Sequence, residues 1–392
     1  MTLISFFDED PIDNIGDIVL LKPSRCIFLG DDKLMKKRRR NLITQFVENR
    51  SMETTVEFHS LPRGDIDGTL GLLRELIERY PDCIFDVTGG TEMHLAAAGI
   101  ISGMYDIPLY QRNGKNGKLL WQYGCQLAPQ AAALCVSEVI SLHNGAVIDE
   151  TMMSKPDITD ALGQDIIHLW EIAKKDPAGW NNTCTSLAEL TEKSETFDPL
   201  QIVVTGQQDQ KAFYRADMPI LADLMVGGYL QEVDYAWSGI SFRYRDGDIR
   251  MILTKAGMLL ELYTYMAAHW ADDRAVSICL DWDGMDANKG GIQTRNELDV
   301  MLTSGLLPIC ISCKNGEFDK NALYELDTIS KHFAGRYAKK VLISSYGGKS
   351  EQSLKTLERR ARDMNIVPIF DVHRLSYEEF SQRLRHELIG EG

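Results

Sequence analysis

The chain has 392 residues, of which 44% are hydrophobic and 25% charged, and its formal net charge at pH 7 is −15. This length allows two or three domains with a core each, and the composition is typical of an ordinary globular protein. No apolar run approaches the ~20 residues of a membrane helix, and residues 1–10 turn acidic without the basic flank of a secretion signal. We therefore expect a cytoplasmic protein with no membrane partner.

The acidic excess argues at first sight against nucleic acid as a partner, but it is unevenly distributed. Residues 1–150 hold 15 basic and 21 acidic residues, whereas residues 251–392 hold 18 and 20. A positive groove in the C-terminal part is therefore compatible with the composition, although composition alone does not reveal one.

Eight cysteines are scattered along the chain, as expected for reduced thiols in the cytosol. Cys310 and Cys313 have C-x-x-C spacing, but they lie in a strand-like run and no second pair accompanies them in the sequence. We interpret them as structural thiols rather than as a redox or zinc pair.

The first 125 residues alternate between strands and helices. Buried strands are predicted over 2–7, 25–30, 54–59 and 83–90, and helices over 12–21, 36–50 and 68–80. This alternation predicts parallel strands with helices on both faces, a doubly wound α/β domain that we assign to residues 1–145. Folds of this kind bind ligands at the carboxyl ends of their strands.

A glycine pair follows the last of these strands. The sequence "FDVTGGTEMHLAAAGI" runs from a strand through Thr88, Gly89, Gly90 and Thr91 into a helix of small residues. Glycines let the backbone approach a ligand closely, and a helix N-terminus offers free N–H donors to a phosphate. Taken alone, the pair fits a tight structural turn equally well. Its spacing is neither that of a dinucleotide dehydrogenase nor that of a P-loop.

Two further loops are expected beside this one, because parallel strands end at one edge of a sheet. They carry Asp10, Asn14 and Gly30 as candidate ligand-binding residues, in an acidic rim that favours a ligand also held by its bases or sugars. The basic run 36–40 fits a phosphate clamp, but the apolar positions that follow in the same helix favour a solvated helix face.

Residues 146–250 form a different kind of segment. Helices with acidic polar faces are predicted over 160–176 and 218–233, and residues 240–253 contain two β-rich arms around Asp246-Gly247, which indicates a hairpin. Helices followed by a hairpin resemble a winged helix. The acidic surroundings favour a small connector over a DNA reader.

Residues 251–392 are assigned to a second α/β domain. Helices are predicted over 255–270, 321–334 and 353–366, and strands over 275–282, 338–346 and 367–372, with a further pair of strands within 296–314.

The predicted strand pair within "NELDVMLTSGLLPICISCK" has charged residues near both ends of an otherwise largely apolar run. Since strand residues alternate between faces, Glu297 and Asp299 share one face, and a turn at Ser304-Gly305 returns the chain toward Lys314. A carboxylate pair binds a hard cation such as Mg²⁺ or Mn²⁺, which activates water for attack on a phosphate. Glu261, on the preceding helix, adds a carboxylate. A structural Asp–Lys ion pair is the alternative, but the order of elements favours a catalytic site.

At these residues the chain resembles two known modules. Glu261, Asp299 and the run Ser312-Cys313-Lys314 resemble the PD-(D/E)XK nuclease core, and "DVTGGTE" is similar to the ligand loop of a CRISPR-associated Rossmann (CARF) domain. Together they resemble, over nearly the whole chain, the CRISPR ancillary nucleases of the Card/Can family. The implied fold is a Rossmann-like CARF domain, a winged-helix-like connector and a restriction-endonuclease-like C-terminal domain.

The resemblance implies a homodimer that binds a cyclic oligoadenylate, usually the four-membered ring, and then cleaves DNA, RNA or both with Mn²⁺ or Mg²⁺. Asp299 and Glu261 would bind the metal, and Lys314 would be the catalytic lysine. Ser312 departs from the nuclease pattern, which has an acidic residue two positions before the lysine. Glu92 departs from the CARF pattern, since many CARF domains have a lysine at that position. The candidates to compensate for Ser312 are Glu297, Glu317 and the backbone carbonyl of Cys313.

Two other functions remain open at the level of sequence. A ligand-controlled transcription regulator would use the N-terminal domain and the connector, but it leaves Asp299 and Lys314 unexplained. A ring nuclease that only degrades its ligand would leave the C-terminal domain without a role.

Overall fold

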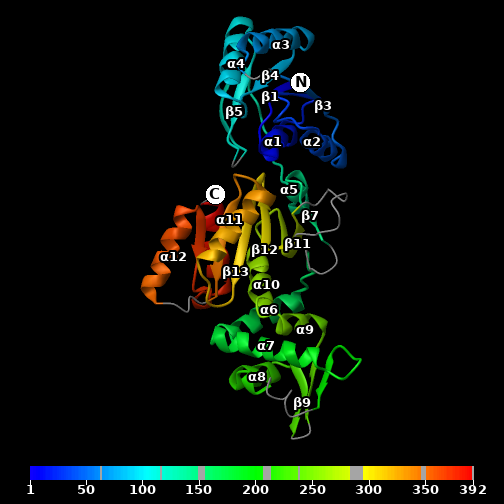
Figure 1. Ribbon diagram of the computed structural model, residues 1–392, viewed down its shortest axis with the longest axis vertical. Helices are drawn as coiled ribbons and strands as arrows, with labels where there is room; N and C mark the ends of the chain where they lie inside the picture. Colours follow the sequence, from blue (N-terminus) through cyan, green and yellow to red (C-terminus); the bar gives the residue numbers. More distant parts are fainter. Residues whose placement is uncertain are drawn as a thin grey trace.

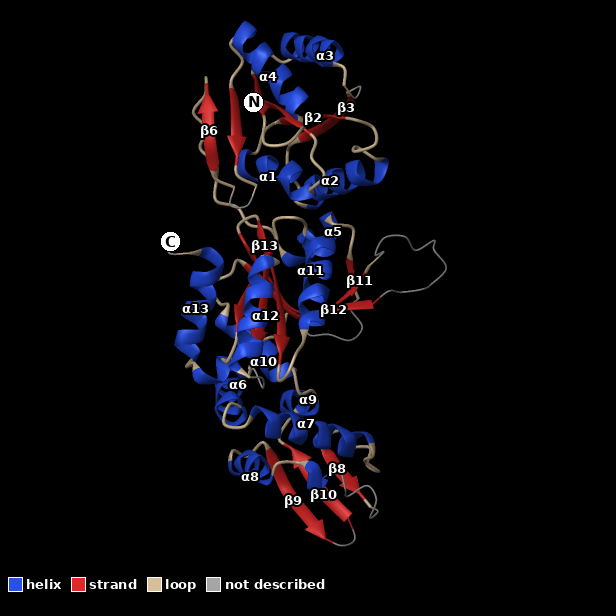
Figure 2. Cartoon of the chain, turned by 60° about the vertical axis from the view of Figure 1, so that its left-hand side comes forward, coloured by secondary structure: helices blue, strands red, loops and turns tan. Residues whose placement is uncertain are grey.

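A computed structural model describes residues 1–61, 64–114, 117–148, 155–205, 213–236, 239–282, 295–345 and 350–390. The chain forms three tiers along one long axis (Figure 1). The N-terminal domain lies at one end and the connector lies at the other. The C-terminal α/β domain therefore lies between the two parts of the chain that precede it in sequence (Figure 2).

The N-terminal domain is built on a six-stranded sheet in the order β3-β2-β1-β4-β5-β6, parallel except for β6. The strands are β1 (Thr2–Phe6), β2 (Arg25–Gly30), β3 (Thr55–Ser60), β4 (Cys83–Asp86), β5 (Leu109–Arg112) and β6 (Leu119–Tyr123). Apolar residues of α1 (Pro11–Leu21) and α2 (Lys37–Asn49) pack on one face, and those of α3 (Ile66–Arg79) and α4 (Glu92–Tyr105) on the other. The doubly wound arrangement is confirmed, and the strand order reverses between β1 and β4.

A charged network is buried in this domain, against α1. Arg112 at the end of β5 donates from Nε to both carboxylate oxygens of Asp17 at 3.2 Å and from Nη2 to the Asp13 carbonyl at 3.0 Å. Gly16 leaves the space for this guanidinium, since a Cβ there would lie 2.6 Å from Arg112 Nη2. Arg112 and Asp17 are each about 2% exposed, so their ionisation is coupled to folding.

We expect the wild-type protein to lose stability relative to an Asp17→Asn variant as the pH rises from about 4 to about 7. Burial first, and then the Asp86 charge, raise the pKa of Asp17 to about 7, against the opposing effect of Arg112. A carboxyl with a raised folded-state pKa holds its proton more tightly in the folded chain. The stability that this proton contributes is therefore lost as the pH rises from the unfolded-state pKa to the folded-state pKa. Thermal unfolding of both proteins measures it, and a constant difference in melting temperature would contradict the raised pKa.

The C-terminal domain contains a second six-stranded sheet, in the order β15-β14-β13-β12-β11-β7. Its strands are β7 (Ala146–Val147), β11 (Asp273–Asp281), β12 (Arg295–Ser304), β13 (Leu307–Lys314), β14 (Lys339–Ser344) and β15 (Ile366–Ile369). β11, β12 and β13 are antiparallel neighbours, whereas β13, β14 and β15 are parallel. One face packs on α10 (Met258–Ala267) and α13 (Tyr377–Ile389), the other on α11 (Lys320–Ala334) and α12 (Glu351–Asp363).

In its described residues the connector has four α-helices and a three-stranded antiparallel sheet of order β8-β10-β9. Its elements are α6 (Asp160–Ala173), α7 (Pro177–Glu192), β8 (Gln201–Val204), α8 (Met218–Val226), β9 (Leu230–Ala236), β10 (Gly239–Tyr244) and α9 (Gly247–Thr254). A hairpin is present, but it is formed by β9 and β10 rather than around Asp246-Gly247, as the sequence had indicated.

Two element predictions in the connector are therefore wrong, for local reasons. The Asp246 carboxylate accepts the Ile249 amide at 2.8 Å and caps α9, because aspartate before glycine suits a helix N-terminus as well as a hairpin turn. The helix predicted over 218–233 ends at Val226, where Gly227 and the positive-φ Gly228 stop it, and residues 230–233 belong to β9.

The three tiers share their cores. Trp170 of α6 stacks on Tyr263 of α10 at 4.8 Å, so the connector packs against the C-terminal domain. Helix α5 (Val136–Leu142) lies in one apolar cluster with α1, α2 and α11, and this joins the N-terminal domain to the C-terminal sheet. Within the residues that the structure describes, no helix combines the length and the apolar character needed to cross a membrane.

Candidate active site and ligand-binding loop

The polar residues of the β12–β13 pair gather where the two strands separate. Their backbone register runs from Ser304/Leu307 to Val300/Ile311. Beyond that point the Asp299 carboxylate accepts the Cys313 amide at 2.6 Å and the Ser312 hydroxyl at 3.1 Å. Asp299 is thereby held between the strands, with its side chain 16% exposed.

Lys314 completes this face of the strand pair. Its Nζ lies 3.8 Å from Asp299 Oδ2, and its backbone pairs with Ser344 of β14. A cavity of about 90 Å³ opens here, and Glu297, Leu298, Asp299, Ser312, Lys314, Glu325, Leu326 and Ile329 line it. The alternation argument therefore placed Glu297, Asp299 and Lys314 correctly around one small space.

Glu261 approaches the same acids from α10. Its carboxylate accepts the Ser277 hydroxyl. Burial first, and then the charge of Asp299, raise the pKa of Glu261 to about 7. Burial likewise raises the pKa of Asp299, although Lys314 and the Cys313 amide oppose the shift. The Asp299 charge thus favours the protonated form of Glu261, and a bound cation would oppose this effect.

The residues proposed to replace an acid at position 312 differ in placement. Glu297 is exposed and lines the cavity, whereas Glu317 is exposed on the loop that follows β13. The Cys313 side chain points into the apolar core, 3.6 Å from Thr264 Oγ1, and burial raises the pKa of its thiol. Only the backbone carbonyl of Cys313 is therefore suited to a hard cation.

Glu325 was not identified from the sequence. It lies on α11, lines the cavity, and its charge adds to the raised pKa of Asp299. Helical periodicity places it on an exposed face and gives no sign of a neighbouring strand end. Among the described residues, no group of three or more His, Cys, Asp or Glu side chains is arranged as a metal site.

Cys310 and Cys313 lie in the cores on opposite faces of the sheet. Both are buried, and burial raises the pKa of both thiols. This placement supports the interpretation as structural thiols rather than as a C-x-x-C pair.

The glycine loop of the N-terminal domain connects β4 to α4. A Cβ at Gly89 would lie 2.6 Å from the Phe6 carbonyl oxygen, and one at Gly90 would lie 2.7 Å from Phe6 Cβ. Gly90 also has a φ of +95°, which disfavours other residues. Thr91 accepts the His94 amide at 3.4 Å and caps α4. The loop thus lies against the end of β1, at the point where the strand order reverses.

Gly90 and Thr91 are exposed, whereas Thr88 is half-buried and its hydroxyl accepts the Arg112 amide at 2.9 Å. Exposed backbone N–H groups at the start of α4 are suited to a phosphate. Close packing against Phe6 therefore explains why glycine is needed at positions 89 and 90. The outer part of the loop is exposed to solvent.

The other candidate ligand residues have partners within the chain. Asp10 caps α1 through the Ile12 amide at 3.0 Å and accepts the Arg336 amide at 3.0 Å. Asn14 accepts the Asp8 amide at 2.7 Å and donates to the Asp8 carbonyl at 2.9 Å. Gly30 is buried between Phe7 and Met35. These three residues shape the edge of the sheet, and whether they touch a ligand stays a prediction.

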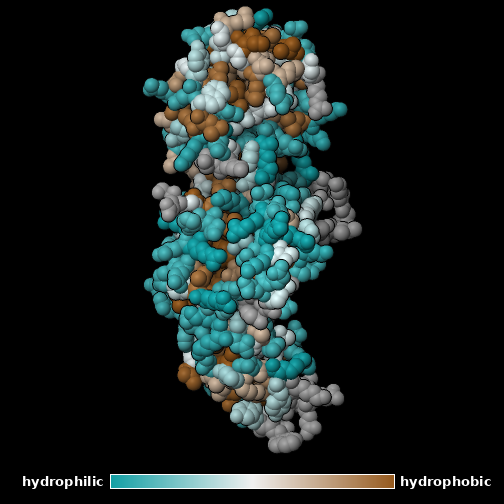
Figure 3. Space-filling view, turned by 90° about the vertical axis from the view of Figure 1, so that its left-hand side faces the viewer, coloured by the Kyte–Doolittle hydropathy of each residue, from teal (hydrophilic) through white to brown (hydrophobic). Residues whose placement is uncertain are grey.

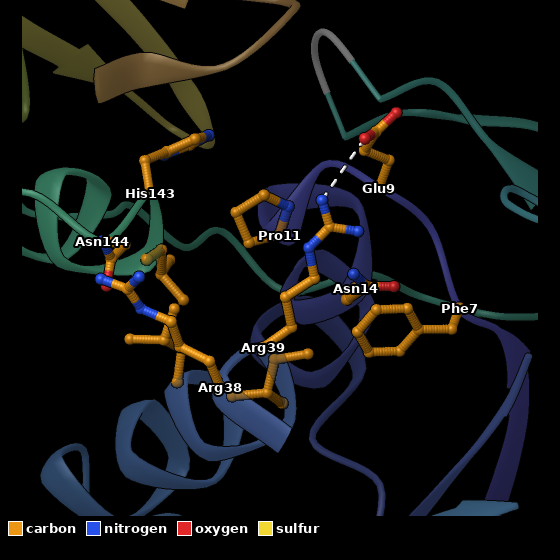
Figure 4. Close-up of a pocket in the computed structure, with 11 residues that line it drawn as sticks. Phe7, Glu9, Pro11, Asn14, Arg38, Arg39, His143 and Asn144 are labelled. Carbon is orange, nitrogen blue, oxygen red and sulfur yellow. Dashed lines mark hydrogen bonds and ion pairs between the residues drawn. The ribbon is translucent and has the colours of Figure 1, made fainter. Parts of the chain in front are cut away.

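The basic run 36–40 begins α2, beside a pocket of about 260 Å³ (Figure 4). Arg39 pairs with Glu9 at 3.3 Å, and Phe7, Asn14, Arg38 and His143 line the same pocket. The pocket lies on the α1/α2 side of the sheet, whereas the glycine loop leads into α4 on the other side. Lys36, Lys37 and Arg38 are exposed, which supports the solvated helix face.

The N-terminal and C-terminal domains meet at the β1–α1 turn. Arg336, which follows α11, donates to Asp8 at 3.0 Å and to Asp13 at 2.6 Å. Gly335 allows this approach, since a Cβ there would lie 2.6 Å from Asp10. The helix that lines the cavity beside Asp299 therefore ends against the β1–α1 edge of the N-terminal sheet.

No protein-family model and no curated protein matches the sequence. Among solved structures, the protein VC1899 from Vibrio cholerae superposes with a TM-score of 0.76 at 16% identity, over 99% of this chain and 98% of that one. Can2 from Sulfobacillus thermosulfidooxidans, solved in complex with cyclic tetra-adenylate, superposes with a TM-score of 0.68 at 16% identity, over 100% and 97%. The chain has the fold of Can2. The expected α/β fold class is thereby confirmed.

Proposed function

We propose that this protein is a cyclic oligoadenylate-activated, metal-dependent nuclease that cleaves DNA or RNA in type III CRISPR defence, in the cytoplasm. The observation that carries the proposal is the Asp299–Lys314 pair at 3.8 Å where β12 and β13 separate, with Glu261 beside it. The fold shared with Can2, a protein solved with cyclic tetra-adenylate, supports the same assignment.

In this proposal Asp299, Glu261 and the Cys313 carbonyl would hold Mn²⁺ or Mg²⁺. They are hard oxygen donors, and the effect of the Asp299 charge on the partly buried Glu261 carboxylate fits a divalent cation. When bound, the ion supplies an activated water and neutralises charge on the phosphate. The Asp299 carboxylate is oriented by the Cys313 amide, and Lys314 would steady the charge that develops on the phosphate.

The activator would bind at the Thr88–Thr91 loop. A ring of repeated nucleotides has the symmetry of a homodimer, in which each copy offers the same loop to an equivalent phosphate. The backbone donors at the start of α4 would take the phosphate, and the acidic rim would select for a ligand also bound through its bases or sugars.

An exposed apolar stripe on α4 supports the dimer. Glycines 99 and 103 have open space around them, and Ile100 and Met104 are 43% and 60% exposed. Figure 3 shows apolar residues gathered over the N-terminal domain, where Leu120, Trp121 and Tyr123 of β6 are also exposed. Small residues let two helices approach closely, and pairing through α4 would bring both glycine loops together. We infer that a second copy of this chain covers the stripe.

A variant with Ile100→Asp and Met104→Asp is expected to be monomeric and to lose ring binding. Both side chains are exposed, so the variant should fold normally, but four carboxylates would meet across a two-fold contact. Sedimentation and calorimetry with cyclic tetra-adenylate measure both properties. Met225→Asp on α8, where Met225 is 43% exposed, is the matched control. A dimer that binds the ring despite both substitutions would contradict this interface.

The function itself is tested by incubating the protein with plasmid DNA and with RNA, in Mn²⁺ or in chelator, with and without cyclic tetra-adenylate. Cleavage that requires both metal and ring supports the proposal. Degradation of the ring alone would point to a ring nuclease, and ring-dependent DNA binding without cleavage would point to a transcription regulator. Either result would overturn the nuclease assignment.

A further inference from the structure

An amide pair joins the connector to the residue that follows Lys314. Asn181 of α7 donates from Nδ2 to the Asn315 carbonyl, and Asn315 Nδ2 donates back to Asn181 Oδ1 at 2.6 Å. The same Asn315 amide donates to the Ala256 carbonyl at 3.0 Å, at the start of the helix that carries Glu261. The contact spans 134 residues of sequence, and α7 lies at the connector end of the C-terminal sheet (Figure 2).

The backbone around Lys314 is thus fixed from three directions. The Asp299 carboxylate accepts the Cys313 amide at 2.6 Å, on the β12 side. The Lys314 carbonyl accepts the Ser345 amide at 3.1 Å, on the β14 side. The Asn181–Asn315 pair holds the backbone on the connector side, directly after β13 ends at Lys314.

The loop beyond this pair needs the same close contact. Gly316 has a φ of +137°, and a Cβ there would lie 3.2 Å from Asn181 Nδ2. The chain therefore turns directly over the Asn181 amide. A side-chain amide that donates and accepts at once continues the hydrogen bonding of a strand end, because it presents the same two groups as a backbone peptide.

We propose that Asn181 is a positioning residue for Lys314, and that the connector thereby completes the active site. This inference rests on the proposed function. Asn181 is not among the residues that line the cavity beside Asp299 and Lys314, and it acts through Asn315. Removal of a residue that supports a catalytic side chain typically lowers the activity of the enzyme by about 10- to 100-fold.

The test compares Asn181→Ala with Asn182→Ala, the same change one residue along α7, where Asn182 is exposed. We expect Asn181→Ala to lower kcat for ring-activated plasmid or RNA cleavage at least ~10-fold, with KM and melting temperature as in the control. Alanine is a better helix former than asparagine, so α7 should be retained. An Asn181→Ala/Asn315→Ala double variant should be no slower than Asn315→Ala, since both changes remove one contact.

Amide hydrogen exchange provides a readout that does not depend on cleavage. Exchange over residues 313–316 should be faster in Asn181→Ala than in Asn182→Ala. Equal exchange, equal kcat, or additive effects in the double variant would each overturn the inference. If the wild type cleaves neither DNA nor RNA, the proposed function is wrong. The comparison of amide exchange between Asn181→Ala and Asn182→Ala then still decides whether Asn181 fixes residues 313–316.

Discussion

Lys314→Ala and Asp299→Asn are each expected to lower metal-dependent nucleic-acid cleavage by at least ~10²-fold without unfolding the protein. Lys314 is the cation nearest to the Asp299 carboxylate among the side chains that line the cavity. Asparagine is preferable to alanine at position 299, because its amide oxygen still accepts the Cys313 amide. Alanine would leave that buried donor unpaired, at a cost of about 1–3 kcal/mol.

Measurements of melting temperature and of ring binding show whether a variant has lost only its catalytic activity or has also lost its fold. Burial raises the pKa of Asp299, so removal of its charge should not lower the melting temperature. Cyclic tetra-adenylate should bind both variants as it binds the wild type, since the proposed ring site lies in the other domain. Lys355→Ala and Asp363→Asn, at exposed positions of α12, are the matched controls. Wild-type cleavage rates in either active-site variant would remove Asp299 and Lys314 from the mechanism.

Local patterns predicted the parts of the site that depend on local geometry. Strand alternation placed Glu297, Asp299 and Lys314 on one face, and the turn at Ser304-Gly305 is the connection between β12 and β13. Glu261 could be identified because it is an acid within an apolar helical run. The glycine pair could be placed at a sheet edge because parallel strands end together.

Contacts between distant segments could not be predicted in this way. The amide of Asn181 meets Asn315 across 134 residues, and Glu325 reaches the cavity only because α11 packs on β13. The Asp246-Gly247 error has a different origin, since the same two residues suit a hairpin and a helix cap. The following apolar spacing at Ile249, Ile252 and Leu253 is the signal that favours the helix.

The second prediction with a large expected effect concerns the Thr88–Thr91 loop of the N-terminal domain. Gly90→Val is expected to abolish the response to cyclic tetra-adenylate while basal cleavage and Mn²⁺ binding stay as in the unliganded wild type. Valine resists a φ of +95°, and its Cβ would lie 2.7 Å from Phe6 Cβ, so the loop must move away from β1. A ligand shifts activity only by binding the active arrangement better, so the loss of its contacts removes the activation and leaves the chemistry.

The control for this variant is Gly71→Val on α3, in the same domain, where a Cβ would meet open space. Titration of labelled ring and plasmid cleavage are to be measured for Gly90→Val, Gly71→Val and Lys314→Ala together. Gly71→Val should respond to the ring, Lys314→Ala should bind it and cut nothing, and Gly90→Val should cut only at the basal rate. Circular dichroism of Gly90→Val tests whether the N-terminal sheet is retained, because the displaced loop costs packing at Phe6. If Gly90→Val binds the ring and responds to it as the wild type does, the glycine loop is a structural turn, and the activator must bind elsewhere.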